Sequence, residues 1–215
     1  MDITYLGHSS FRIRGKNASV VIDPYDSAMV GLKFPKHIAT DILLVTHDHP
    51  DHNAVSQIDG EPFVVRGPGE YEIKGVEIIG IPVYHDAQKG QERGTNTMYR
   101  IEIDGVSIVH AGDLGHTLST GEVDGLDGVN ILMIPVGGVY TISAAQAAQV
   151  IKEIEPSVVI PMHYGKPELV KQTFGQLATL ADFLKEMGKE GTPAQSKLTI
   201  TKDKIPEEMQ VVVLE

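Results

Sequence analysis

The sequence concentrates metal-binding side chains in one short segment, Thr46-His-Asp-His-Pro-Asp-His52. Residues two apart in an extended chain lie on the same side, so His47 and His49 can share one cation. Asp51 and His52 are adjacent, project in different directions and can reach a second position. Imidazole and carboxylate ligands suit divalent zinc, manganese or iron, and the absence of Cys argues against a purely structural zinc site. The segment therefore predicts a metal site with nitrogen and oxygen ligands.

A solvated histidine-rich loop or an affinity tag is the alternative interpretation of this segment. A tag would be a terminal run, whereas this segment is internal and overlaps the end of Ile42–Thr46, a continuous apolar run of strand length. Pro50 disfavours helical geometry at His49 and helps to fix the turn. Four candidate ligands at the end of a buried strand favour a metal site over a surface loop.

The segment matches the H-x-H-x-D-H motif of the metallo-β-lactamase superfamily, which the chain resembles over about residues 3 to 165. The other motifs of that superfamily follow in order: Val21-Ile-Asp23-Pro24, Pro82-Val-Tyr-His85-Asp, His110-Ala-Gly-Asp113 and Pro161-Met-His163-Tyr-Gly. Gly7-His-Ser-Ser-Phe11, with the Pro-Met-His-Tyr-Gly segment, is similar to the branch of metal-dependent hydrolases that contains the L-ascorbate-6-phosphate lactonase. The resemblance implies an α/β fold, a four-layer αββα sandwich.

The resemblance also implies seven ligands in two groups that share one bridging carboxylate. The first ion would be held by His47, His49 and His85, and the second by Asp51, His52 and His163, with Asp113 as the bridge. Asp23 would support the metal-binding loop without binding metal. Two divalent ions, most readily zinc, with manganese or iron as alternatives, would clamp a bridging hydroxide that attacks a carbonyl or phosphorus centre. Asp51 would also orient the nucleophile or pass a proton to the leaving group.

The remote ligands each follow a predicted strand, and each has a structural alternative. His85 could be an exposed residue before a polar loop, and Asp113 could form a turn after Gly112. His163 follows the apolar run Val158–Met162, at the carboxyl end of a strand where α/β sites gather. Four ligand clusters at four strand ends are the pattern that one sheet edge would produce, which favours ligand roles.

Further candidates lie beside these motifs. His8 could support a ligand or contact the substrate, with a position in a surface loop as the alternative. Tyr164 is a candidate contact for the leaving group or an oxyanion, although tyrosines also fill pocket rims. His110 could orient a ligand or be a satisfied histidine at a strand end. His116 is a candidate substrate contact, and His37 is expected to be solvated.

The elements that must position these residues are mainly strands. They are predicted at Ile3–Leu6, Phe11–Arg14, Ser19–Asp23, Ile42–Thr46, Phe63–Arg66, Tyr71–Ile73, Val76–Val83, Thr97–Ile103, Val106–His110, Ile131–Val136, Val158–Met162, Leu198–Thr201 and Val211–Leu214. Ser143 and Gln146 form a capping box for a helix that ends before Pro156. A second helix is expected from Pro167 to Gly188, and a shorter one within Asp51–Ile58. Such a set buries itself best as a layered α/β sandwich.

Composition narrows the classes of function. The 215 residues, 41% of them hydrophobic, are expected to form one domain over 1–215. A net charge of −11 disfavours binding to nucleic acid or to anionic membranes. Without Cys there is no disulfide, thiolate ligand or cysteine nucleophile. No apolar run reaches the length of a membrane span and no secretory signal is visible, so we expect a cytoplasmic protein. Homo-oligomerisation stays open.

Three functions remain in consideration. The favoured one is a metal-dependent hydrolase of a small-molecule ester, lactone or phosphoester. A nuclease or phosphodiesterase acting on nucleic acid would use the same chemistry, but the absence of Trp and the 6% aromatic content leave little for base stacking. A metal-binding module without enzymatic activity is the third, and the complete set of ligands argues against it.

Overall fold

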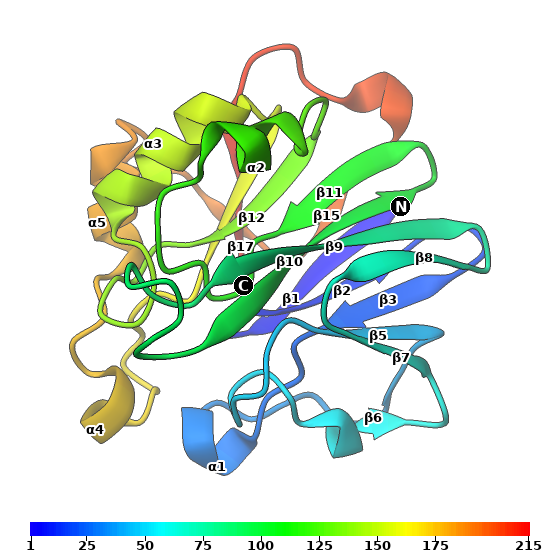
Figure 1. Ribbon diagram of the computed structural model, residues 1–215, viewed down its shortest axis with the longest axis horizontal. Helices are drawn as coiled ribbons and strands as arrows, with labels where there is room; N and C mark the ends of the chain where they lie inside the picture. The colour runs from blue at the N-terminus through cyan, green and yellow to red at the C-terminus, as the bar shows by residue number, and fades with distance from the viewer.

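Two large β-sheets lie face to face in the computed structural model, which describes residues 1–215 (Figure 1). The six-stranded sheet contains, in spatial order, β15 (Leu198–Thr199), β1 (Asp2–Gly7), β2 (Ser10–Arg14), β3 (Ser19–Ile22), β5 (Ile42–Val45) and β7 (Phe63–Arg66). The seven-stranded sheet contains β16 (Gln210–Val211), β13 (Val158–Met162), β12 (Ile131–Pro135), β11 (Val106–His110), β10 (Thr95–Ile103), β9 (Val76–Tyr84) and β8 (Gly69–Ile73). Two short parallel pairs complete the strands, β14 (Ala194–Gln195) with β17 (Val213–Leu214) and β4 (Ile38–Ala39) with β6 (Ile58–Asp59).

The directions of the strands bring several carboxyl ends together. In the first sheet β1, β2 and β3 form an antiparallel meander, and β5 and β7 then add parallel to β3. In the second sheet β8 to β11 alternate in direction, and β12, β13 and β16 add parallel to β11. The carboxyl ends of β1, β3 and β5 therefore share one edge, and those of β9, β11 and β13 share one edge of the other sheet.

The main core fills the space between the sheets. Ile13, Ile22 and Leu44 of the first sheet pack with Ile78 and Ile108 of the second, and all five side chains are fully buried. The strand β5 is buried along its whole length, as its continuous apolar run predicts, because its other face is also covered.

Helices cover both outer faces. On the seven-stranded sheet, α2 (Thr120–Asp124), α3 (Ala144–Ile154) and α5 (Leu180–Glu186) lie over a core that includes Val150, Phe183 and Leu132. On the six-stranded sheet, the shorter helices α1 (Ser27–Val30) and α4 (Lys171–Phe174) contribute Val30 and Phe174 to a smaller core. The expected αββα sandwich is therefore confirmed, with one outer layer much thinner than the other. No helix combines the length and the apolar character that a membrane span requires.

The helices differ from the sequence-based expectation in two places. The capping box at Ser143 begins α3 as predicted. The helix expected from Pro167 to Gly188 is instead divided into α4 and α5, because Thr179 makes a new capping box and Ala178 N–H donates to the backbone oxygen of Gly137. The expected helix within 51–58 is reduced to a single 3₁₀ turn, Val55–Gln57. A second 3₁₀ turn spans Lys202–Lys204.

Candidate metal centre

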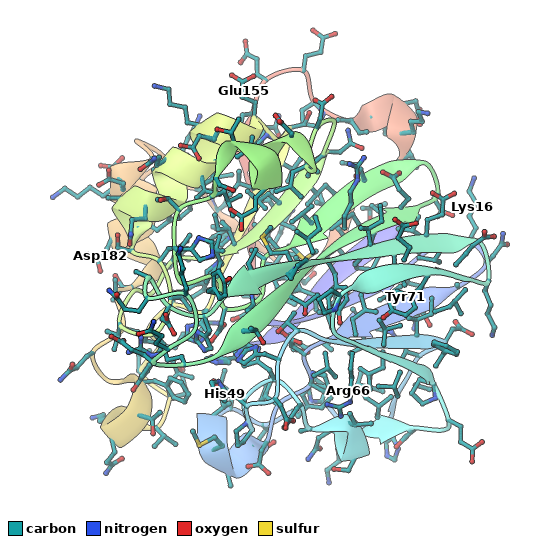
Figure 2. All side chains as sticks on the ribbon, viewed as in Figure 1. Lys16, His49, Arg66, Tyr71, Glu155 and Asp182 are labelled. Carbon is teal, nitrogen blue, oxygen red and sulfur yellow. The ribbon has the colours of Figure 1, made fainter.

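The predicted ligands all lie at carboxyl ends of strands. The segment from His47 to His52 follows β5, His85 follows β9, Asp113 comes three residues after β11, and His163 follows β13. They come from both sheets rather than from the single sheet edge that the sequence suggested. The stacking of the sheets places both edges at the same end of the sandwich, and His49 marks that end in Figure 2, opposite the turn that carries Lys16.

Three histidines form the first group of donors. His47, His49 and His85 each offer one nitrogen, and these atoms lie within 4.8 Å of one another. The ring centroids of His47 and His49 are 4.7 Å apart, and those of His47 and His85 are 4.8 Å apart. The structure therefore brings together the three residues that the resemblance assigns to the first ion, although His85 follows the others by more than thirty positions.

A second group of donors lies beside the first. It contains Asp51, His52 and His163, as expected, and also His8. His8 Nε2 donates to Asp51 Oδ2 at 3.1 Å, and His52 Nε2 is 3.6 Å from the same oxygen. The ring of His8 also packs on that of His163, with centroids 4.2 Å apart. His8 is fully buried here, so the alternative of a surface loop is wrong.

Asp113 lies between the two groups. Its Oδ2 is 3.3 Å from His85 Nε2 of the first group and 3.4 Å from His163 Nε2 of the second. Its Oδ1 is 3.3 Å from His52 Nε2. The Asp113 side chain is almost fully buried, so one carboxylate faces both groups with little exposure to bulk water.

Several buried polar atoms of these groups have no hydrogen-bond partner. Four of these atoms are Nε2 of His47, His52 and His163 and Oδ1 of Asp113. An unsatisfied buried polar atom costs about 1–3 kcal/mol, so a cluster of four is expensive unless another group binds them. Nitrogen and oxygen donors directed at one space are the ligands that divalent zinc, manganese and iron accept. The residues present therefore fit divalent metal.

Three of the buried imidazoles, those of His47, His8 and His85, are held in the neutral form that a ligand needs. Burial lowers the pKa of His47 to about 3 and the pKa of His8 to about 4. Burial also lowers the pKa of His85. Neutral imidazole has a free nitrogen lone pair at neutral pH, which is a condition for binding metal.

The carboxylates stay ionised despite their burial. Burial by itself raises the pKa of a carboxyl group, but His163 beside Asp113 and His52 beside Asp51 outweigh it and hold both pKa values well below the usual range. Burial lowers the pKa of His52, yet the surrounding carboxylates outweigh it and raise that pKa well above its ordinary value. The centre is thus rich in negative charge and attracts cations.

Asp23 orients His52 directly and His47 through Thr46, through contacts at the Nδ1 atoms of the two rings. Its Oδ2 accepts hydrogen bonds from His52 Nδ1 at 2.8 Å and from the Thr46 hydroxyl at 2.7 Å. Because the hydroxyl proton of Thr46 is donated to Asp23, Thr46 Oγ1 can only accept the hydrogen bond from His47 Nδ1, 2.9 Å away. Both Nδ1 atoms are thereby engaged, and both Nε2 atoms face the donor cluster. This is the supporting role that the resemblance implies for Asp23.

Asn96 positions Asp113 and was not recognised from the sequence. Its amide donates to the Ala111 carbonyl at 2.8 Å, and its oxygen accepts from the Asp113 backbone N–H at 3.2 Å. Gly112, between them, has φ +55°, and a Cβ there would collide with Asn96 Oδ1. Asn96 lies in a strand that mixes polar and apolar residues, β10, so no local signal distinguished it in the sequence.

His110 is hydrogen-bonded at both ring nitrogens. Its Nε2 donates to the Ser9 carbonyl at 2.8 Å, and its Nδ1 accepts from the Gly112 N–H at 3.1 Å. It is therefore a satisfied strand-end histidine that joins two loops of the site. His116 pairs with backbone at both nitrogens, and the side chain of His37 is 89% exposed, as expected.

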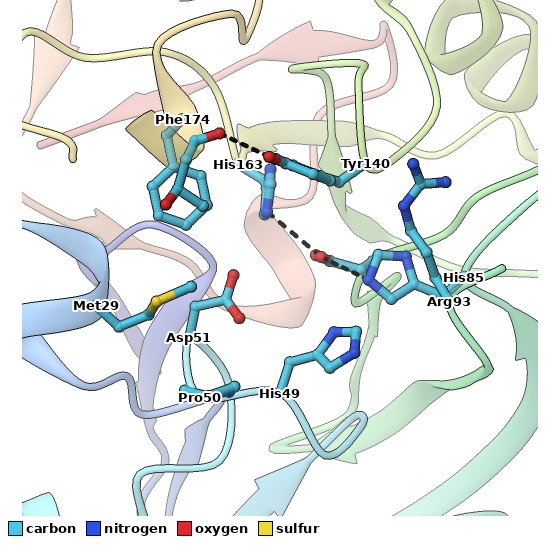
Figure 3. Close-up of a pocket in the computed structure, with 11 residues that line it drawn as sticks. Met29, His49, Pro50, Asp51, His85, Arg93, Tyr140, His163 and Phe174 are labelled. Atoms are coloured by element: carbon cyan, nitrogen blue, oxygen red, sulfur yellow. Dashed lines mark hydrogen bonds and ion pairs between the residues drawn. The ribbon is translucent and has the colours of Figure 1, made fainter. Parts of the chain in front are cut away.

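A cavity of about 300 Å³ opens onto the donor cluster (Figure 3). Among the predicted site residues, it is lined by His49, Asp51, His85, Asp113 and His163. His8 does not line the cavity but lies behind it, in contact with Asp51, His163 and Phe174, which do.

Tyr164 is not part of the lining. Its ring packs against the ammonium group of Lys166, 5.3 Å away, in the core beside the site. Tyr140, Phe174, Met29 and Arg93 line the cavity instead. Tyr140, and not Tyr164, is therefore the tyrosine that lines the cavity. Arg93 belongs to no motif, which is why the sequence did not single it out.

Comparison with known proteins identifies the family of the chain. A family model described as a beta-lactamase superfamily domain matches residues 2–163. A UPF0173 metal-dependent hydrolase from Methanopyrus kandleri is 29% identical over 194 residues, which cover 77% of this chain and 84% of the relative. Another, from Thermoplasma volcanium, is 30% identical over 196 residues, which cover 80% of this chain and 86% of the relative.

Solved structures show the same fold. A protein of Thermotoga maritima, provisionally described as a Zn-dependent hydrolase of the metallo-beta-lactamase superfamily, matches with a TM-score of 0.81 and 31% identity. That match covers 100% of this chain and 98% of the other. An isothiocyanate hydrolase from Delia radicum gut bacteria matches at 0.72 with 17% identity, over 94% of this chain and 100% of that one, which shows a likeness of fold alone. The chain belongs to the beta-lactamase superfamily and is a metal-dependent hydrolase of the UPF0173 family.

Proposed function

We propose that the enzyme uses two divalent metal ions to hydrolyse a small-molecule ester, lactone or phosphoester. The observation that carries this proposal is the position of Asp113. Its two oxygens face His85 on one side and His52 and His163 on the other, at 3.3–3.4 Å. A single carboxylate between two clusters of donors is the arrangement that a pair of neighbouring ions requires.

The residues that would hold the ions are divided as the resemblance implies. One ion would be held by His47, His49 and His85, the other by Asp51, His52 and His163, and Asp113 would contact both. Zinc is the first choice for this set, with manganese or iron as alternatives, because imidazole and carboxylate accept all three. When bound, the ions supply Lewis-acid chemistry, making water nucleophilic near neutral pH and stabilising negative charge that develops on oxygen.

The protein's own residues contribute positioning and proton transfer. The Asp51 carboxylate faces the cavity (Figure 3). The N–H of His8 donates to this carboxylate and holds it in place. In this position Asp51 can accept the proton of the attacking water and pass it to the leaving group. His8 is a positioning residue, because it touches Asp51 and does not line the cavity.

The size and the walls of the cavity support a small substrate. A volume of about 300 Å³ lies at the lower end of the range for small-molecule pockets, and Met29 and Phe174 provide an apolar wall. The net charge of −11 opposes the approach of a polyanion. A small-molecule substrate is therefore proposed rather than nucleic acid.

Metal analysis followed by a substrate panel tests the proposal. We expect two divalent ions per chain after purification without added metal, and turnover of at least one member of a panel of esters, lactones and phosphodiesters. His49→Ala and Asp51→Ala should each lose metal and at least about 100-fold in activity. The exposed His37→Asn serves as the control and should retain both.

The alternative functions predict different results on the same samples. Cleavage of RNA or DNA with a binding constant that falls steeply with salt would favour the nuclease. Bound metal without turnover across the whole panel would favour a module that only binds metal. Full activity of Asp51→Ala on a defined substrate would contradict the proposed mechanism.

A further inference from the structure

We propose that Arg93 binds an anionic group of the substrate, so that the enzyme acts on small esters, lactones or phosphoesters that carry a carboxylate or phosphate substituent. This inference rests on the proposed function and specifies its substrate class. It is carried by the position of Arg93 in the wall of the cavity, by the contacts of its guanidinium and by the loop that supports it.

Arg93 is the one Lys or Arg side chain among the residues that line the cavity. The carboxylates of the lining, Asp51 and Asp113, belong to the donor cluster. Figure 3 shows the guanidinium beside the ring of Tyr140, on the far side of His85 from Asp51. A substrate that reaches the metal centre with one end therefore meets a fixed cation in the wall, at a place that the metal ligands do not occupy.

Two contacts position the guanidinium of Arg93, and some of its N–H groups have no hydrogen-bond partner in the protein. Its carbon lies 5.7 Å from the ring centroid of Tyr140, a cation–π contact, and Nη1 is 3.3 Å from Glu92 Oε2. Nε and Nη2 have no hydrogen-bond partner in the protein, and the side chain is 32% exposed. A guanidinium with free N–H groups matches the paired oxygens of a carboxylate or phosphate.

Tyr140, which supports the guanidinium, is itself fixed. Its hydroxyl donates to the Thr173 carbonyl at 2.7 Å, and its ring meets Phe174 edge to face with centroids 6.2 Å apart. The ring therefore holds one face of the guanidinium in place, and little conformational entropy remains to be lost when an anion binds.

The loop that carries Arg93 is built around the carboxylate of Asp86. Its oxygens accept four backbone N–H groups, those of Gln88, Gly90, Glu92 and Arg93, at 2.7–3.0 Å. The loop is closed by a hydrogen bond from His85 N–H to the Gly94 carbonyl at 3.0 Å. Because Asp86 follows His85 directly, the backbone of Arg93 is tied to a residue of the donor cluster. The distance between the cation and the metal centre is thereby set by a rigid unit rather than by a flexible loop.

A pair of matched inhibitors tests the inference without relying on turnover. Succinic monohydroxamic acid and its terminal carboxamide share a hydroxamate, which chelates divalent metal, and differ only in the charge of the other end. We expect isothermal titration calorimetry on the zinc-loaded protein to show that the carboxylate form binds about tenfold more tightly or better. Arg93→Gln should abolish this preference and leave the metal content and the affinity for the carboxamide unchanged.

Two further variants sharpen the comparison. Arg93→Lys keeps the charge but loses the fork of N–H groups, so it should retain only part of the preference. Arg100→Gln is the matched control, because Arg100 pairs with Glu102 and the Gly125 carbonyl away from the cavity. It should behave as the wild type. A third hydroxamate with a terminal phosphate shows which of the two anions the site prefers.

The failure of this inference is distinguishable from the failure of the proposed function. Equal binding of the carboxylate, phosphate and carboxamide forms to the wild type would overturn the role of Arg93 and leave the metal-dependent mechanism standing. Equal weakening of all forms by Arg93→Gln would also overturn it, because Arg93 would then act through the fold. If no hydroxamate binds the zinc-treated protein, the proposed function falls and the inference falls with it.

Discussion

The carboxylate of Asp23 accepts a hydrogen bond from Nδ1 of His52 at 2.8 Å, and both side chains are completely buried. The two residues are 29 positions apart, and they lie in the segments that follow the neighbouring parallel strands β3 and β5. This contact directs His52 Nε2 at the donor cluster. Because Asp23 also fixes His47 through Thr46, one carboxylate outside the proposed ligand set orients two histidines within it.

Replacing Asp23 should therefore weaken metal binding without removing a ligand. Asp23→Asn keeps the shape but loses the charge that holds the N–H of His52, and we expect metal affinity to fall about 10- to 100-fold. Competition with a chromogenic zinc chelator measures the change. Asp127→Asn, which alters an exposed carboxylate on the outer face, should leave the affinity unchanged. An unaltered affinity in Asp23→Asn would show that the orientation of His52 does not depend on this contact.

His8 should act through Asp51. His8 has φ +55°, so His8→Asn suits the backbone while its shorter side chain no longer reaches Asp51. We expect a fall in kcat of about tenfold or more in His8→Asn, with KM little changed, because the carboxylate loses its support. His8→Gln, whose amide can donate over a longer reach, should restore part of the activity. Equal losses in the two variants would indicate that His8 only fills space.

Removal of metal should lower thermal stability. The buried carboxylates Asp51 and Asp113 repel each other when no dication is bound. At a free zinc concentration about 100 times Kd, binding stabilises the folded state by about 2.7 kcal/mol. For a chain of this size, that corresponds to a rise in Tm of roughly 5–10 °C over the chelated protein. Differential scanning calorimetry with EDTA and with restored zinc measures the shift, and identical Tm values would argue against a metal centre in this cluster.

Gly112 should tolerate no side chain. A Cβ at this position would collide with Asn96 Oδ1 and approach the Thr46 side chain, and the residue has φ +55°. Gly128 has a similar φ of +74° but open space around it. Gly128→Ala should therefore cost about 1–2 kcal/mol for backbone conformation, and Gly112→Ala about 1–3 kcal/mol more for the collision. Urea denaturation of the two variants separates these costs, and equal values would contradict the tight contact.

The stability contributed by Asp41 should depend on pH. Asp41 accepts hydrogen bonds from Lys74 and from the N–H and hydroxyl of Ser19, which lower its pKa to about 2. A carboxyl whose pKa is lower in the folded state stabilises above its unfolded value of about 3.9 and loses this effect as the pH falls toward 2. Because its side chain is 29% exposed, we expect Asp41→Asn to cost only about 1 kcal/mol at pH 6.

Urea titrations of the wild type and Asp41→Asn between pH 3 and 7 check the direction of this pH dependence. The difference in the free energy of unfolding should be constant above about pH 5 and shrink below pH 4. A difference that grows as the pH falls would contradict the assignment.

The sequence by itself determined the chemistry of the centre and the elements that carry it. The motif from His47 to His52, and the isolated His85, Asp113 and His163, could be placed at strand ends. Apolar runs and capping boxes are local signals that do not depend on the rest of the chain. The strands that position the site, and the helix α3, are accordingly found where the pattern predicts them.

Only the tertiary structure decided how those strand ends meet and what surrounds them. The ligands come from two stacked sheets, and the contacts of His8 with Asp51 and of Asn96 with Asp113 cross 43 and 17 positions of chain. Arg93 and Tyr140 reach the cavity from separate loops, and the break between α4 and α5 follows from a backbone contact with Gly137. These features depend on packing between segments distant in sequence, and no local pattern of side chains encodes such packing.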